Sequence, residues 1–166
     1  MIFVTVGNAT QGFRRLLNAV EALAAEGLFK DDEVVIQSGN TSNFCSLRGK
    51  QERFLPMEQF SEMIAKANLV ICHAGAGTLF HVLQARKVPV VMPRRKHYGE
   101  LVDDHQVELT EALTSQGRAI PAYEPEDLRA AILDAQSRRN KTPSSPLLML
   151  KLVEESIAEL VGHSSK

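Results

Sequence analysis

Short runs of β-branched and apolar residues alternate along this chain with segments of helical periodicity. The strand candidates are residues 2–6, 33–37, 53–55, 69–72, 88–92 and, more weakly marked, 118–120. Strands that alternate with helices are joined by crossover connections, and these build a parallel sheet with helices on both faces. We therefore predict an α/β fold with a Rossmann-like, doubly wound parallel sheet.

The helical segments are marked by apolar side chains at intervals of three and four residues. This spacing runs through residues 13–24, and Gly27 stands where such a helix should stop. It recurs at residues 79–83, and residues 101–113 and 125–135 are two further helix candidates.

The segment 137–146 is polar and basic and contains two prolines, a composition typical of a linker. The residues before it, 1–136, have the usual size of one domain. Beyond it, in residues 147–166, apolar side chains fall on one face of a helix and charged ones elsewhere. We expect a C-terminal amphipathic helix and tail there, packed on this domain or on another chain.

Composition excludes several classes of function. The formal net charge of -1 gives no general attraction to nucleic acid, so no nucleic-acid partner is expected. Cys45 and Cys72 are far apart and belong to no CxxC motif, which argues against a disulfide framework or a zinc site. The first apolar run is too short for a signal peptide or a membrane span. We expect a cytoplasmic protein without a metal or other cofactor.

A turn of small residues follows the fourth predicted strand, at residues 73–78. In parallel sheets ligands bind beyond the carboxyl ends of the strands. Gly75 and Gly77 would let the backbone approach a ligand there, and the free amides of the following helix favour an anion such as a diphosphate. The alternative is that these glycines serve only close packing of helix on sheet.

The segment 93–106 is a long, polar connection after a buried strand, where connections are usually shorter. We interpret it as a binding loop. Asp103, Asp104 and His105 could be metal ligands, but adjacent side chains rarely converge on one ion, and a helix start with aspartate fits better. The P-loop pattern GxxxxGK[ST] is absent, and no GxGxxG follows the first strand, which argues against P-loop and NAD-binding functions.

Together, residues 68–78, 88–94 and 98–106 resemble the C-terminal domain of glycosyltransferase family 28, and the resemblance extends over roughly 1–135. It implies the donor-binding half of a GT-B fold. Full-length relatives carry an acceptor domain before this one, whereas here Met1 directly precedes the first donor-domain strand. The resemblance is therefore to the soluble catalytic subunit of two-chain enzymes, the eukaryotic dolichol-linked N-acetylglucosaminyltransferase and bacterial exopolysaccharide enzymes of the PssE type.

This resemblance implies an inverting hexosyltransferase that moves a sugar from a UDP-sugar donor to a lipid-linked acceptor, together with a membrane-anchored acceptor-domain subunit. It also implies recruitment to the cytoplasmic face of the membrane through that partner. Two alternatives stay open: a non-catalytic, regulatory nucleotide-sugar-binding subunit and a standalone enzyme that processes UDP-sugars.

The family's donor-binding positions are carried over one by one. The diphosphate would be held by Gly75, Ala76, Gly77 and Thr78. Residues after the first strand should face the same cleft, namely Gly7, Asn8, Thr10 and Gln11. The long loop and the helix that follows it supply further candidates, with Gln106 beside the ribose or the sugar and, as lesser candidates, Arg94, Glu100 and Asp104.

Three histidines complete the candidate site. His73 and His105 are the catalytic candidates, although a histidine ending an apolar strand is at least as often a packed residue with a backbone partner. His81 stands where family members often have a glutamate that accepts from the ribose hydroxyls. A neutral imidazole can still accept one hydrogen bond.

Overall fold

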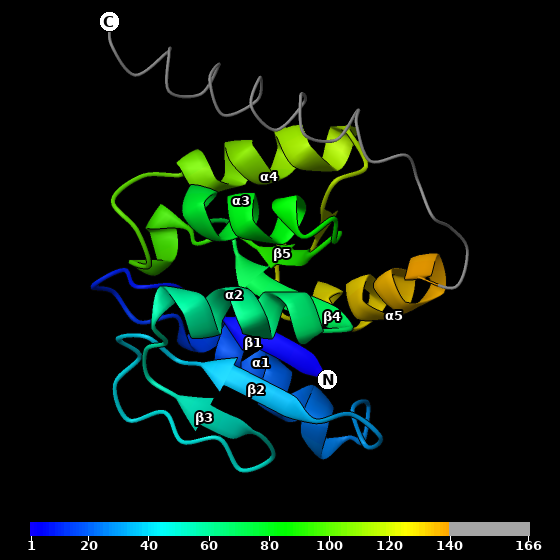
Figure 1. Cartoon of the computed structure of the whole chain (residues 1–166). Helices are drawn as coiled ribbons and strands as arrows, with labels where there is room; N and C mark the ends of the chain where they lie inside the picture. Colours follow the sequence, from blue (N-terminus) through cyan, green and yellow to red (C-terminus); the bar gives the residue numbers. More distant parts are fainter. Residues whose placement is uncertain (140–166) are drawn as a thin grey trace, which may run out of the picture.

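Six parallel strands form one sheet in the computed structural model, which describes residues 1–139 (Figure 1). The strands are β1 (Ile2–Thr5), β2 (Val34–Gln37), β3 (Lys50–Glu52), β4 (Leu69–His73), β5 (Val90–Met92) and β6 (Ile120–Pro121). Their order in the sheet is β3-β2-β1-β4-β5-β6, and every pair of neighbours is parallel. The predicted doubly wound sheet is confirmed, and its order reverses between β1 and β4, where such sheets bind ligands.

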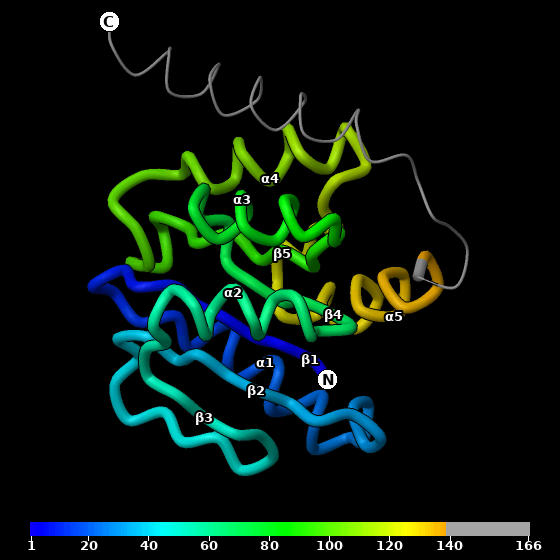
Figure 2. The backbone as a smooth tube through the Cα atoms, viewed as in Figure 1, coloured from blue at the N-terminus to red at the C-terminus, as the bar shows by residue number. Residues whose placement is uncertain are grey.

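Helices cover both faces of this sheet (Figure 2). One face packs against α1 (Arg14–Ala25) and α5 (Asp127–Arg139), and the other against α2 (Met57–Lys66), α3 (Ala76–Gln84) and α4 (His105–Ser115). Side chains of β1 alternate between the two cores, because successive residues of a strand point to opposite faces. Ile2 and Val4 join the α1–α5 core, and Phe3 joins the core under α2, α3 and α4.

Two predicted boundaries were wrong for reasons visible in the sheet and its loops. The third strand was expected at 53–55 but is Lys50–Glu52, whose three residues are all exposed at the sheet edge. An edge strand of this kind shows no apolar pattern. The helix expected at 101–113 begins only at His105, because Glu100 and Asp104 are bound to the preceding loop through the backbone nitrogens of Arg95 and Lys96.

Helix α2 was not predicted at all, although it begins directly after Pro56 and buries Phe60 and Ile64. At the other end, α5 runs to Arg139, so the first three residues of the predicted linker 137–146 are helical. The rest of that linker and the predicted helix at 147–166 lie outside the described residues.

Arg94 ties together the loops that follow β1 and β5. Its side chain is 0% exposed, and its guanidinium donates to four carbonyl oxygens of these loops. Nη2 donates to Val6 at 2.9 Å, and Nη1 donates to Gln11, Gly12 and Glu100 at 3.0, 3.1 and 3.3 Å. The guanidinium also lies over the Phe13 ring, 4.7 Å from its centroid. The loop after β1 has no regular secondary structure, and this one side chain supplies hydrogen-bond donors to three of its carbonyl oxygens, those of Val6, Gln11 and Gly12.

A second arginine closes this network. Arg15 of α1 makes a bidentate ion pair with Glu100, at 3.0 and 2.9 Å, and also donates to the Pro93 and Tyr123 carbonyls. When a guanidinium and a carboxylate of low exposure are joined by two parallel hydrogen bonds, the orientation of both groups is fixed. The loop after β5 is thus fastened to α1 as well as to the loop after β1.

We expect Arg94→Met to destabilise the fold by about 3 kcal/mol, because the carbonyls that it binds would be left buried without a donor. Urea unfolding followed by circular dichroism measures this difference at constant m-value. Lys96→Met is the control, since Lys96 is exposed two residues away and its change should stay within about 0.5 kcal/mol. Equal stabilities of the two variants would contradict this role of Arg94.

Candidate functional site

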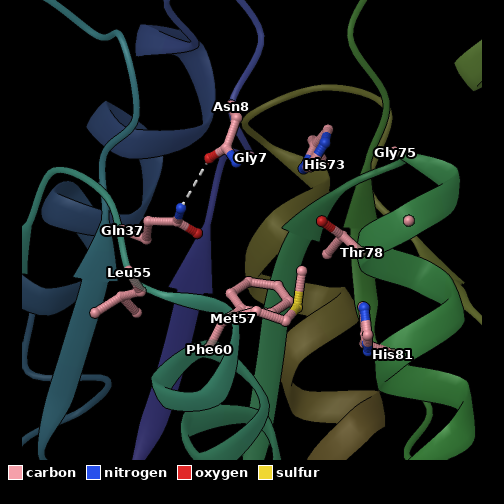
Figure 3. Close-up of a pocket in the computed structure, with 11 residues that line it drawn as sticks. Gly7, Asn8, Gln37, Leu55, Met57, Phe60, His73, Gly75, Thr78 and His81 are labelled. Carbon is pink, nitrogen blue, oxygen red and sulfur yellow. Dashed lines mark hydrogen bonds between the residues drawn. The ribbon is translucent and has the colours of Figure 1, made fainter.

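A pocket of about 270 Å³ opens where the strand order reverses, at the carboxyl ends of β1 and β4 (Figure 3). It is lined by residues of the β1 loop, the end of β2, the start of α2, the end of β4 and the start of α3. These residues are Gly7, Asn8, Gln37, Leu55, Met57, Phe60, His73, Gly75, Gly77, Thr78 and His81.

The first turn of α3 forms one wall of this pocket. Gly75 occupies the N-cap position, and no side chain among the described residues caps the helix. The first amides of a helix have no partner within the helix and carry the positive end of its dipole. A Cβ on Gly77 would have no heavy atom within 4 Å, so the backbone of this turn faces open space. The wall can therefore bind an anionic group through backbone amides.

His73 forms the back of the pocket, and its ring is packed between two glycines. A Cβ on Gly7 would lie 2.6 Å from Nε2, and a Cβ on Gly75 would lie 2.9 Å from Cδ2 and nearer still to Nε2. Both distances are far below normal contact. Gly7 and Gly75 are thus required by the imidazole itself, and Gly7 also has a positive φ of 69°.

The imidazole of His73 is neutral at physiological pH. Burial, and to a smaller extent the charge of Arg94, lowers the pKa of His73 from 6.5 to about 3, against a weak opposing effect of the Thr5 backbone. Nδ1 is buried and makes no hydrogen bond within residues 1–139. A neutral ring at the back of the pocket can accept or donate one hydrogen bond but adds no charge.

The wall opposite the β1 loop is mainly apolar. It is made by Leu55, Met57 and Phe60, with Met57 62% exposed at the rim. His81 joins this wall from α3, with its ring edge-on to Phe60 at 6.0 Å and to Phe80 at 5.6 Å between centroids. The pocket therefore has an apolar end beside α2 and a polar end between the β1 loop and α3.

The structure brings seven of the residues expected in the site to this pocket, namely Gly7, Asn8, His73, Gly75, Gly77, Thr78 and His81. Thr10, Gln11 and Ala76 lie on the same loop or helix turn without lining it. Their roles toward a ligand stay predictions.

The candidates from the long loop and the start of α4 are not brought to the pocket. Gln106 is 5% exposed, and its Oε1 accepts from the backbone nitrogen of Arg94 at 3.1 Å. Glu100 is 7% exposed and bound to Arg15, and Arg94 is enclosed completely. Asp104 accepts from the Lys96 nitrogen at 2.9 Å, and His105 is exposed and pairs with Asp103. Contacts within the domain thus account for the buried side chains of Arg94, Glu100 and Gln106. A role of this loop toward a ligand stays a prediction.

Four residues that line the pocket were not expected in it. Met57 and Phe60 belong to α2, which was not predicted, and Leu55 lies just before it, at the end of the strand expected at 53–55. Gln37 ends β2. Gln37 could have been recognised, because it is a polar residue at the carboxyl end of an apolar strand, where ligands of parallel sheets bind.

Within residues 1–139, no three histidine, cysteine or acidic side chains are grouped so that they could hold a metal ion. Burial raises the pKa of the Cys72 thiol, which removes it as a nucleophile. None of the helices described has the length and apolar character needed to cross a bilayer.

The strand order and the helices on both faces define a Rossmann-like α/β domain of the GT-B type. The model of the glycosyltransferase family 28 C-terminal domain matches residues 1–158. The chain belongs to this family.

Individual relatives agree with this assignment. The UDP-N-acetylglucosamine transferase subunit ALG13 of two Cryptococcus neoformans strains is 40% identical over 65 residues, which cover 38% of this chain and 30% of that protein. This match thus spans less than a third of these curated relatives. The glycosyltransferase of kitacinnamycin has a TM-score of 0.60 at 20% identity, over 82% of this chain and 34% of that one, and shares the fold.

We expect Gly75→Ala to destabilise the domain by about 1 to 3 kcal/mol, because the added methyl group must displace a histidine already held on its other side by Gly7. Gly77→Ala is the matched variant. Its methyl group meets open space at a helical position, so stability should be equal or slightly higher. Thermal unfolding of both variants checks this, and a loss confined to Gly77→Ala would overturn the packing described for His73.

The stability of the domain should fall with acidity in a way that depends on His73. The unfolded chain binds a proton at this residue below about pH 6.5, whereas the folded chain does so only near pH 3. Stability from this group is therefore complete above pH 6.5 and is lost as the pH falls, by up to about 1.4 kcal/mol per unit.

Urea unfolding at pH 7 and pH 5 measures this slope in the wild type and in His73→Gln. The variant should show a shallower pH dependence, whatever its stability at pH 7. An unchanged slope would show that His73 is not held neutral by the fold.

Proposed function

We propose that this chain is the donor-binding subunit of a glycosyltransferase that moves a sugar from a UDP-sugar to a lipid-linked acceptor in polysaccharide or glycan synthesis. The observation that carries the proposal is the uncapped first turn of α3, which opens onto a pocket at the switch point of the sheet. Backbone amides at this place suit the diphosphate of a nucleotide sugar.

The charges behind the β1 loop support an anionic ligand, although none of them lines the pocket itself. The cluster of Arg15, Arg94, Arg95, Glu100 and Glu124 carries three positive and two negative groups, and the uncompensated charge lies under the β1 loop. Burial lowers the pKa of Arg94 only to about 10, so it stays charged at neutral pH. Fixed positive charge and helix amides stabilise the negative charge that develops on a departing diphosphate without a divalent ion.

The shape of the pocket supports a nucleotide. Its apolar end beside Leu55, Met57 and Phe60 suits a flat base, and its polar end suits phosphates. His81 lies at that apolar end, where it could accept from a ribose hydroxyl. The curated relatives are named as UDP-N-acetylglucosamine transferase subunits, which favours uridine and a hexosyl group.

A partner that supplies the acceptor site completes the proposal. The described residues form a single sheet, whereas GT-B enzymes place donor and acceptor on two such domains. We propose a membrane-anchored partner that recruits this chain to the cytoplasmic face of the membrane and supplies the catalytic base. His73 is neutral and enclosed, and His105 is an exposed residue at the start of α4 that does not line the pocket, so we assign the base to neither.

Calorimetric titration with UDP tests the donor site directly. Gly77→Val should weaken UDP binding at least about tenfold, or about 1.4 kcal/mol, because its side chain would fill the space before the α3 amides. Ala130→Val on the exposed surface of α5 is the control and should bind as the wild type does. Equal affinity of all three proteins would exclude the α3 turn as the phosphate site.

Sugar transfer by the full chain, alone and with membranes from its own cells, separates the alternatives. We expect transfer to lipid only when membranes are present. Turnover of UDP-sugars by the purified chain would indicate a standalone enzyme. Binding without turnover in either setting would indicate a regulatory subunit.

A further inference from the structure

Gln37 is the polar side chain on the floor of the pocket whose role the proposed function leaves open. It is 3% exposed and lies at the end of β2, beside the β1 loop. Its Oε1 accepts from Thr5 Oγ1 at 2.6 Å, and its Nε2 donates to Asn8 Oδ1 at 3.1 Å. The two partners stand at the end of β1 and on the loop after it, so Gln37 spans this corner (Figure 3).

The direction of each hydrogen bond follows from a count of protons. Thr5 Oγ1 accepts from the Gly7 nitrogen at 3.2 Å and donates its single proton to Gln37. Thr5 is 0% exposed, so the opposite orientation of the Gln37 amide would leave this proton buried without an acceptor among the described residues. Thr5 therefore faces the oxygen of the Gln37 amide, and the nitrogen of that amide must face Asn8. Since this nitrogen can only donate, Asn8 presents its oxygen to Gln37.

The orientation of Asn8 leaves its Nδ2 donor available to a ligand in the pocket. With Oδ1 occupied by Gln37, Nδ2 points away from it and has no hydrogen-bond partner among the residues of the described domain. Across the pocket lie Thr78 and the uncapped amides of α3 (Figure 3). Donors thus line both sides of the polar end.

We propose that Gln37 is a positioning residue that holds the Asn8 amide with its nitrogen toward the pocket, so that Asn8 donates to a phosphoryl oxygen of the bound nucleotide. This inference rests on the proposed function, because it requires a phosphate between the β1 loop and α3. Without Gln37 the Asn8 amide is free to rotate, and it then presents an acceptor as readily as a donor. An acceptor at this place repels a phosphate.

The proposed positioning role and a purely structural role of Gln37 differ in one respect: only the positioning role makes the effect of a Gln37 substitution depend on Asn8. Two variants remove the donor at residue 37: Gln37→Met is close in volume, and Gln37→Glu keeps the acceptor for Thr5. If Gln37 acts through Asn8, the cost of Gln37→Met must disappear once Asn8 has been changed to alanine. A general loss of packing would instead add to the effect of Asn8→Ala.

The experiment is a double-mutant cycle with UDP and uridine as the two ligands, measured by calorimetry on the full chain. We expect Gln37→Met and Asn8→Ala each to weaken UDP binding about tenfold, as for one charge-assisted hydrogen bond, and the double variant to be no weaker than Asn8→Ala. Uridine lacks phosphates, so its affinity should change less than about twofold in every variant. Gln84→Met, at the exposed end of α3, should bind both ligands as the wild type does.

Several results would overturn the inference. Additive losses in the double variant, or equal losses for uridine and UDP, would show that Gln37 acts on the pocket as a whole. If Gln37→Met does not fold, Gln37→Glu takes its place in the cycle, and an undiminished UDP affinity of that variant would refute the role of the Nε2 donor. Failure of the wild type to bind UDP would refute the proposed function as well, whereas wild-type binding with an additive cycle refutes only the role of Gln37.

Discussion

The four hydrogen bonds from the buried guanidinium of Arg94 to backbone carbonyls are the interaction on which the site depends. They fix the loop after β1, which supplies Gly7 and Asn8 to the pocket, against the loop after β5. Neither loop has regular secondary structure at this point, so its carbonyls need donors from elsewhere. An arginine offers five donors in one plane and can serve several carbonyls at once.

The same arrangement explains the electrostatics of the pocket. The charge of Arg94 contributes to keeping His73 neutral, and the neutral ring can then pack tightly between Gly7 and Gly75. Positive charge lies below the β1 loop, the uncapped first turn of α3 lines the pocket, and Asn8 lines it from the β1 loop. The pocket therefore combines a rigid, uncharged back wall with donors at its polar end, as binding of a phosphate requires.

Much of the fold and part of the site could be predicted from sequence patterns. The central strands and α1 are buried on one or two faces, so their periodicity is clear, and the glycine turn before α3 follows a strand directly. The edge strand β3 was misplaced, since exposed sheet edges carry polar residues. The helix α2 was missed although it buries Phe60 and Ile64. In the polar loop 93–106, the sequence could not distinguish a polar side chain that faces a ligand from one, such as Arg94, that binds backbone carbonyls.

The sequence by itself determined the α/β class, the family and the strand ends at which a ligand should bind, because these depend on local periodicity and on short motifs. Only the tertiary structure decided which polar groups share a pocket. Gln37 and Asn8 are 29 residues apart, and Arg94 reaches carbonyls more than 80 residues away. Such contacts depend on strand order and loop direction, which no local pattern encodes. As a result Arg94, Glu100 and Gln106 are buried within the domain, whereas Gln37, Asn8 and the first turn of α3 line the pocket.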